Sequence, residues 1–238
     1  MPFAKLVLAS AVWLLFQIGS LSAQGDEPWT RFRGPTARGV AADDPRLPSS
    51  WSRTENVKWV VDVPGWGWSS PVVWGDKVFV STVVSDVPGE GPRKGLYLGE
   101  GVRNPPPGTH HWLVFCFDLN TGNQLWRHEA HTGRPPVPRH PKSTYASETP
   151  TTDGERLYVL FGDVGLYCYG FDGQLIWEHP IEPKKTLSDF GAAASPVVHG
   201  DQVIMVYDNQ EQSYIAAYDA ATGNQRWQTL RDEPSTWA

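Results

Sequence analysis

Apolar residues along this chain gather in short alternating runs that are separated by turn residues. Three stretches follow one course, in which a proline precedes a glycine by four positions and an apolar residue follows that glycine by three; these stretches begin at Pro71, Pro150 and Pro196. A proline at the start of a strand does little harm to the ladder. A glycine in a two-residue loop supplies the positive φ that a tight hairpin needs. Each stretch therefore predicts a β-hairpin.

A second recurring sequence pattern follows at the end of each unit. In this pattern a glycine precedes a tryptophan by four positions every time. The pairs are Gly122 with Trp126, Gly173 with Trp177, and Gly223 with Trp227. In two of the lines an aspartate, Asp118 or Asp219, is placed to accept hydrogen bonds from its own turn. This ending predicts two further strands around a tight turn, so that each unit has four strands.

Internal repetition of four-stranded units indicates a β-propeller, in which the units are blades arranged around an axis. The three units cover approximately residues 69–129, 147–179 and 193–230. Each tryptophan is expected to wedge between neighbouring sheets. The sequence thus predicts an all-β fold, an incomplete β-propeller of four-stranded antiparallel blades with PQQ-like or WD-like repeats.

Residues 56–61 resemble a fourth strand that carries its tryptophan, Trp59, without the three strands that should precede it. We expect this segment to complete the last blade of a closed ring. The tail 235–238 resembles the lead-in at 147–150, and closed propellers have roughly four to eight blades. We therefore interpret the chain as the N-terminal part of a longer propeller. Its open blade face and strand edge predict self-association.

Composition supports this class of fold. Among 238 residues there are 23 glycines, 21 prolines and 12 tryptophans, a mixture typical of short strands, tight turns and aromatic packing. The formal net charge is −6 and no long basic run occurs, so nucleic-acid binding is not expected.

The first residues have the pattern of an export signal. Lys5 precedes an apolar run at 6–18, and small residues before Ala23 offer a cleavage site. The run is too short for a comfortable membrane span, and Gln24 stands where a lipoprotein would need cysteine. We expect a signal peptide at 1–23, an extended lead-in at 24–55 and the propeller at 56–238. The product is then soluble, without a lipid anchor, in the periplasm or outside the cell.

The two cysteines, Cys116 and Cys168, occupy the same place in successive units, where the third unit has Ala217. Equivalent positions in adjacent blades are too far apart for disulfide geometry. We expect both cysteines to be small buried apolar side chains.

The units resemble the quinoprotein-type (PQQ-like) repeat, whose ending is Ala-x-Asp-x-x-Thr-Gly-x-x-x-Trp. The segment 217–227 matches it in full, and the first unit matches with Cys116 in place of alanine. The lead-in from Trp29 is similar to a large group of exported bacterial PQQ-like propeller proteins of unassigned function.

Two families of different class share this repeat. PQQ-dependent alcohol dehydrogenases hold the quinone and calcium near the axis, and BamB scaffolds outer-membrane β-barrel assembly. The vicinal cysteine pair of the dehydrogenases is absent here, and Gln24 replaces the lipid-bearing cysteine of BamB. No catalytic, cofactor or metal residue can be transferred from either family.

The lengths of the connections between strands indicate where a candidate recognition surface lies. Three long connections, 85–111, 127–146 and 178–193, are expected on one face, and tight glycine turns on the other. Two interpretations remain open, because long loops either recognise a ligand or merely cover the channel mouth. The histidines can be solvated, and Tyr145 and Glu148 can be packing and capping residues. The candidate recognition residues are His110, His111, Arg139, His140, Lys142, Tyr145 and Glu148.

A second set of residues has a predicted structural role in docking one blade on the next. These residues are Trp59, Asp118, Gly122, Trp126, Gly173, Trp177, Asp219, Gly223 and Trp227.

Two functions follow from this reading. The first is a non-enzymatic module that binds a protein, peptide or glycan, with no cofactor. The second is part of a quinoprotein oxidoreductase, for which PQQ and calcium are the expected cofactors.

Overall fold

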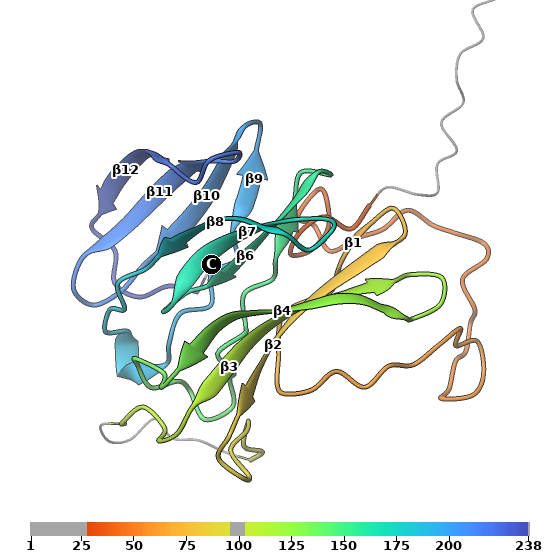
Figure 1. The fold of residues 1–238 in the computed structure, drawn as a ribbon, viewed down its shortest axis with the longest axis horizontal. Coiled ribbons are helices and arrows are strands. Elements are labelled where there is room, and N and C mark those ends of the chain that lie inside the picture. The colour runs from red at the N-terminus through yellow and green to blue at the C-terminus, as the bar shows by residue number, and fades with distance from the viewer. Residues whose placement is uncertain (1–27, 96–102, 238) are drawn as a thin grey trace, which may run out of the picture.

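The computed structural model describes residues 28–95 and 103–237 of the chain. The expected signal peptide at 1–23 and Gln24 lie outside the described residues. Within them the fold is all-β, with three four-stranded antiparallel sheets and one short 3-10 turn, η1 (Leu187–Asp189). Figure 1 shows the sheets following one another from yellow-green through teal to blue. The prediction of an incomplete propeller is confirmed.

Each sheet is a meander whose strands pair in sequence order. The first sheet contains β1 (Val72–Trp74), β2 (Lys77–Ser85), β3 (His110–Asp118) and β4 (Gln124–Gly133). The second contains β5 (Thr151–Thr152), β6 (Arg156–Phe161), β7 (Gly165–Gly170) and β8 (Leu175–Pro180). The third contains β9 (Val197–His199), β10 (Gln202–Tyr207), β11 (Ser213–Asp219) and β12 (Gln225–Arg231).

The repeated prolines and glycines have the same place in all three sheets. Strands β1, β5 and β9 each begin one residue after a repeat proline. The register of the third and fourth strands then shifts at one equivalent point in every sheet, directly after Cys116, Cys168 or Ala217. A bulge of this kind increases the local twist. All three residues before the shift are fully buried, and both cysteines are free thiols.

The first sheet is longer than the sequence pattern predicts. β3 begins at His110 and β4 continues to Gly133, so His110, His111, His128 and His131 lie in strands and not in loops. The ladder continues because His110 pairs with both Ser85 and Gly133. The polar histidine side chains interrupt the apolar alternation from which strand ends were predicted. The sequence pattern therefore did not indicate this extension.

The segment 56–61 is not a strand in the structure, which corrects the secondary structure expected there. A strand needs a neighbouring ladder, and this segment has none among the described residues. Trp59 nevertheless takes the expected place. Its Nε1 donates to the Leu119 carbonyl at 2.8 Å, and its ring lies against Gly122.

The same docking recurs between successive sheets. Trp126 donates from Nε1 to Phe171 O at 3.0 Å, and Trp177 donates to Ala220 O at 3.0 Å. In every case the indole lies on a glycine with positive φ in the next turn. The pairs are Trp59 with Gly122, Trp126 with Gly173, and Trp177 with Gly223.

Two core clusters fill the spaces between the sheets. The first joins residues such as Phe79 and Cys116 of the first sheet to Leu157 and Tyr169 of the second. The second joins the other face of the second sheet to the third. Because each sheet buries one face against its neighbour, burial of apolar area holds the stack together.

The lead-in is tied to the innermost strands. Trp29 O accepts from Val73 N at 2.8 Å, and Thr30 O accepts from Thr152 N at 3.0 Å. These bonds bridge β1 and β5 across the inner edge of two sheets. No helix among the described residues is long and apolar enough to cross a membrane.

Candidate functional site

The long connections of the three sheets meet on one face of the molecule. Arg93 N donates to Pro141 O at 2.7 Å, and His140 N donates to Phe190 O at 3.0 Å. Arg103 adds a side-chain bond from its guanidinium to Ser188 O at 2.7 Å. We call residues 86–95, 103–109, 134–150 and 181–196 the long-loop face. The hydrogen bonds between these segments join them into one layer.

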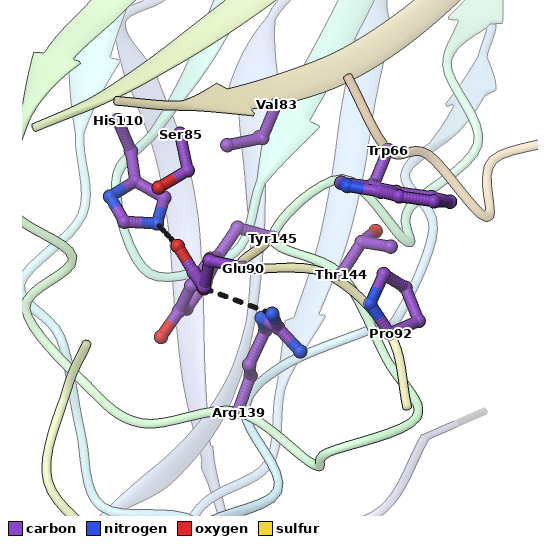
Figure 2. Close-up of a pocket in the computed structure, with 9 residues that line it drawn as sticks. All are labelled: Trp66, Val83, Ser85, Glu90, Pro92, His110, Arg139, Thr144 and Tyr145. Atoms are coloured by element: carbon purple, nitrogen blue, oxygen red, sulfur yellow. Dashed lines mark hydrogen bonds and ion pairs between the residues drawn. The ribbon is translucent and has the colours of Figure 1, made fainter. Parts of the chain in front are cut away.

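A partly buried ion pair joins the insertion 86–109 to the rest of this face. Glu90 Oε1 accepts from Arg139 at 3.0 Å, and Glu90 Oε2 lies 2.6 Å from His110 Nε2. Figure 2 shows the carboxylate between the two partners, with Tyr145 beside them. The Arg139 guanidinium lies 5.4 Å from the centre of the Tyr145 ring, close enough for a cation–π contact.

The charge balance of this cluster keeps Glu90 ionised. Burial alone would raise the pKa of its carboxyl, but a hydrogen bond from Ser85 and the charges of His110 and Arg139 bring it below the ordinary value. Burial raises the pKa of Tyr145, whose hydroxyl donates to Val137 O at 2.8 Å. The tyrosine is thus a neutral packing group.

A cleft of about 520 Å³ adjoins this cluster, between the insertion and the loop after β4. Glu90 and Arg139 line it together with Arg93, Arg103 and Asn104. Among the described residues that line the cleft, Arg93, Arg103 and Arg139 are cationic and Glu90 is anionic, so this part of the lining is mainly cationic. Its rim is formed by prolines from both segments: Pro88, Pro106, Pro107, Pro138 and Pro141. Such a surface suits an anionic or extended partner.

Two buried carboxyl groups lie beneath the same face. Glu148 accepts from Gly162 N at 3.0 Å and from Ser147 N at 3.2 Å, and burial raises its pKa to about 8. Asp163 accepts from the Tyr207 hydroxyl at 2.9 Å, and burial raises its pKa to about 6. Both groups line one small cavity with Arg139 and Tyr145.

The predicted recognition residues are brought together only in part. His110, Arg139 and Tyr145 share the Glu90 cluster, and Glu148 lies in the adjoining cavity. His140 and Lys142 line a different cleft with Trp68, Phe190 and Trp237. His111 faces away from all of these residues. It is bonded to Glu129 at 2.7 Å and Asp86 at 3.3 Å, and the Glu129 hydrogen bond raises its pKa.

Sequence reasoning missed several residues of this face. Glu90 sits in a Pro-Gly-Glu-Gly stretch, where an acid between two glycines was the available signal. Asp163 fills the short turn between β6 and β7, at a position that the first sheet expands into its insertion. Neither role is visible without the partner residues, which come from other loops.

Among residues 28–95 and 103–237, no group of three or more His, Cys, Asp or Glu side chains is arranged to hold a metal ion.

Tryptophan-docked four-stranded sheets with PQQ-like repeat endings define a protein of the PQQ-like β-propeller class. The family described as outer membrane protein assembly factor BamB matches residues 111–237, more than half of the chain. The chain belongs to this family.

The fold is similar to several solved structures at low identity. BamB from Moraxella catarrhalis is 19% identical, with a TM-score of 0.37, over 76% of this chain and 57% of that chain. Quinohemoprotein alcohol dehydrogenase from Comamonas testosteroni is 19% identical, with a TM-score of 0.44, over 70% of this chain and 21% of that one.

A europium-containing methanol dehydrogenase is 13% identical, with a TM-score of 0.45, over 69% of this chain and 24% of its own. The chain therefore spans about a quarter or less of these two dehydrogenases. No curated protein matches it in sequence.

Proposed function

We propose that this chain is an exported binding module that holds a protein, peptide or glycan on its long-loop face. Export rests on the signal pattern at 1–23. Binding rests on one observation: the loops of the long-loop face are bonded into a single layer, and two of them, the insertion and the loop after β4, enclose a cleft whose described lining is mainly cationic. A rigid scaffold that carries elaborated loops on one face is the usual arrangement of a recognition surface.

The opposite face gives a natural contrast. Its connections are tight turns at Gly75, Gly122, Gly154, Gly173, Gly200 and Gly223. Four of these turns, at Gly122, Gly154, Gly173 and Gly223, contact a tryptophan from another segment. The chain therefore separates structural contacts on the tight-turn face from a surface that is available for a partner.

Affinity capture from an extracytoplasmic extract tests the proposal. Arg93 is exposed in the cleft, and Lys58 is exposed on the tight-turn face beside Asn120. We expect Arg93→Glu to release the captured partner by placing a negative charge in the cleft, and Lys58→Glu to retain it. Release by Lys58→Glu with retention by Arg93→Glu would move binding to the other face and contradict the proposal.

The competing hypothesis is a part of a PQQ-dependent oxidoreductase. It predicts that the protein takes up PQQ with calcium and supports dye-linked oxidation of an alcohol. Quinone uptake together with this activity would overturn a purely binding role. Partner capture that depends on Arg93, in protein that takes up no quinone, would favour the binding module.

A further inference from the structure

A second, shallower cleft lies on the long-loop face, where the segments that precede the innermost strands come together. Its volume is about 270 Å³. The aromatic lining is Trp68, Phe190 and Trp237, and the polar lining includes His140, Lys142 and Ser143. Trp68 precedes β1, Ser143 precedes β5, Phe190 precedes β9, and Trp237 follows β12, so the cleft gathers contributions from every sheet.

The two tryptophans are fixed in place but keep their ring faces open. Trp68 Nε1 donates to Lys142 O at 2.8 Å, and Trp237 Nε1 donates to Gly191 O at 2.8 Å. Their exposed fractions are nevertheless 57% and 41%. Phe190 supports Trp237, with 5.9 Å between ring centres. Since both indole N–H groups are already bonded within the chain, these side chains offer a ligand their faces and not their donors.

The polar rim of the cleft is cationic. Lys142 is exposed, and none of the described residues that line the cleft carries a carboxylate. Burial, together with the charges of Arg103 and Lys142, lowers the pKa of His140, so that the imidazole stays neutral near pH 7. An anionic group therefore complements the rim, and its natural partner is the Lys142 ammonium.

We propose that this cleft binds an acidic oligosaccharide, with sugar rings stacked on Trp68 and Trp237 and a sugar carboxylate at Lys142. The inference rests on the proposed binding function and names a ligand class for one part of the same face. One face of a pyranose chair presents C–H groups, and these suit the negative face of an indole. An extended peptide would need backbone hydrogen-bonding partners, whereas both ring N–H groups and the adjacent carbonyls are already bonded to each other.

Calorimetric titration with oligogalacturonate, an oligomer of uronic acid, tests this inference. The uncharged control ligand is a malto-oligosaccharide, and polyglutamate represents an acidic peptide. We expect oligogalacturonate to bind, to quench tryptophan fluorescence and to bind more weakly as salt is raised. Malto-oligosaccharide is expected to bind roughly tenfold more weakly or not at all, because it lacks the carboxylate.

Matched variants locate the binding. Trp68→Ala and Trp237→Ala are each expected to weaken oligogalacturonate binding roughly tenfold. Trp51→Ala removes an indole that is 73% exposed in the lead-in and should leave binding unchanged. Lys142→Glu should abolish binding, and Lys58→Glu on the opposite face should not.

Several outcomes would overturn the inference. One is failure of oligogalacturonate to bind, or equal binding by a folded Trp68→Ala, Trp237→Ala double variant. Another is binding of polyglutamate in its place, which would assign the cleft to acidic peptides. A third is uptake of PQQ with calcium that the same two variants abolish. If uronate binding fails while capture still depends on Arg93, only this inference falls and the proposed function remains.

Discussion

At the residue scale, the contact between an indole and a turn glycine recurs across the fold. The glycine has no side chain, so the ring can lie directly on the backbone of the next sheet while its N–H bonds a carbonyl there. A Cβ on Gly173 would lie 2.9 Å from Trp126 Cγ, and one on Gly223 would lie 2.6 Å from Trp177 Cδ2. The spacing of glycine and tryptophan in the repeat is therefore a requirement of packing between sheets.

Substitution of these glycines separates packing from backbone strain. Gly223→Ala meets Trp177 and also requires φ of +71°, whereas Gly75→Ala requires φ of +57° but meets nothing within 4 Å. Each variant should lose about 1–3 kcal/mol of unfolding free energy from strain. Gly223→Ala should lose clearly more, because Trp177 must shift, and urea denaturation measures both. Equal losses would contradict the docking role of the glycine.

A buried carboxyl makes the stability of the chain depend on pH. The pKa of Glu148 is about 8 in the folded chain against an ordinary value of 4.5, because burial disfavours its charge. Between these values the folded state holds a proton that the unfolded chain has released, so stability falls as pH rises through this window.

The expected difference is measurable with Glu148→Gln. From pH 5 to pH 8.5, the unfolding free energy of the unaltered chain should fall by about 4 kcal/mol more than that of the variant. The variant loses the acceptor for Ser147 N, which lowers its stability at every pH and leaves its slope unaffected. Parallel pH profiles for the two proteins would show that Glu148 is not held protonated.

At the element scale, the turns and the order of strands were readable from the sequence, but the strand ends were not. The repeated proline and glycine reflect local backbone requirements, and such requirements leave a signature in sequence. The extension of β3 to His110 is made by pairing with Ser85 and Gly133, and the His110 side chain then meets Glu90, which comes from a loop 20 positions away. Local patterns carry no information about that partner.

The candidate recognition residues were likewise only partly predictable from the sequence. Long loops on one face were predictable from strand topology, because connection lengths can be counted. Which loop residues meet was not predictable, and His111, adjacent to His110 in sequence, points to a different set of acids. Trp68 and Trp237 lie at opposite ends of the repeat region and meet in one cleft only because the sheets are arranged around an axis.

The Glu90 cluster should control the order of the insertion. Glu90→Gln removes the charge that Arg139 and His110 share, in a site where Glu90 is only 17% exposed and Arg139 only 12%. The substitution leaves a partly buried guanidinium without its counter-ion, which should cost about 1–3 kcal/mol. We expect faster proteolysis and faster hydrogen exchange in 86–95.

A surface ion pair provides the control for this prediction. Glu155 is 78% exposed and lies 3.4 Å from Arg156. Glu155→Gln should change stability by less than about 1 kcal/mol. If both substitutions have the same small effect, the Glu90 cluster does not fix the insertion.

At the scale of the whole molecule, the third sheet differs from the other two. Val203 and Met205 are buried against the second sheet, so the alternation of β10 directs Ile204 and Val206 to the other face. Trp227 is 39% exposed and bonds Gln202 of its own sheet at 3.0 Å, whereas Trp126 and Trp177 bond the next sheet. Apolar surface is therefore left open where a further blade would pack.

Because this apolar face is open, we predict that the 238-residue chain self-associates in solution. Trp227→Lys places a charge on the open face and should raise the dissociation constant for self-association roughly tenfold, measured by sedimentation velocity across a concentration series. Trp51→Lys, in the exposed lead-in, should leave it unchanged. A chain that stays monomeric at every concentration would contradict the prediction.

Hydrogen–deuterium exchange directly tests whether the long-loop face binds the partner while the tight-turn face serves contacts between sheets. The chain is compared alone and with the partner that it captures. With the partner bound, we expect slower exchange in 86–95, 103–109, 134–150 and 181–196. Exchange in the tight turns around Gly122, Gly173 and Gly223 should be unchanged. Protection of those turns, with no change in the long-loop face, would contradict this expectation.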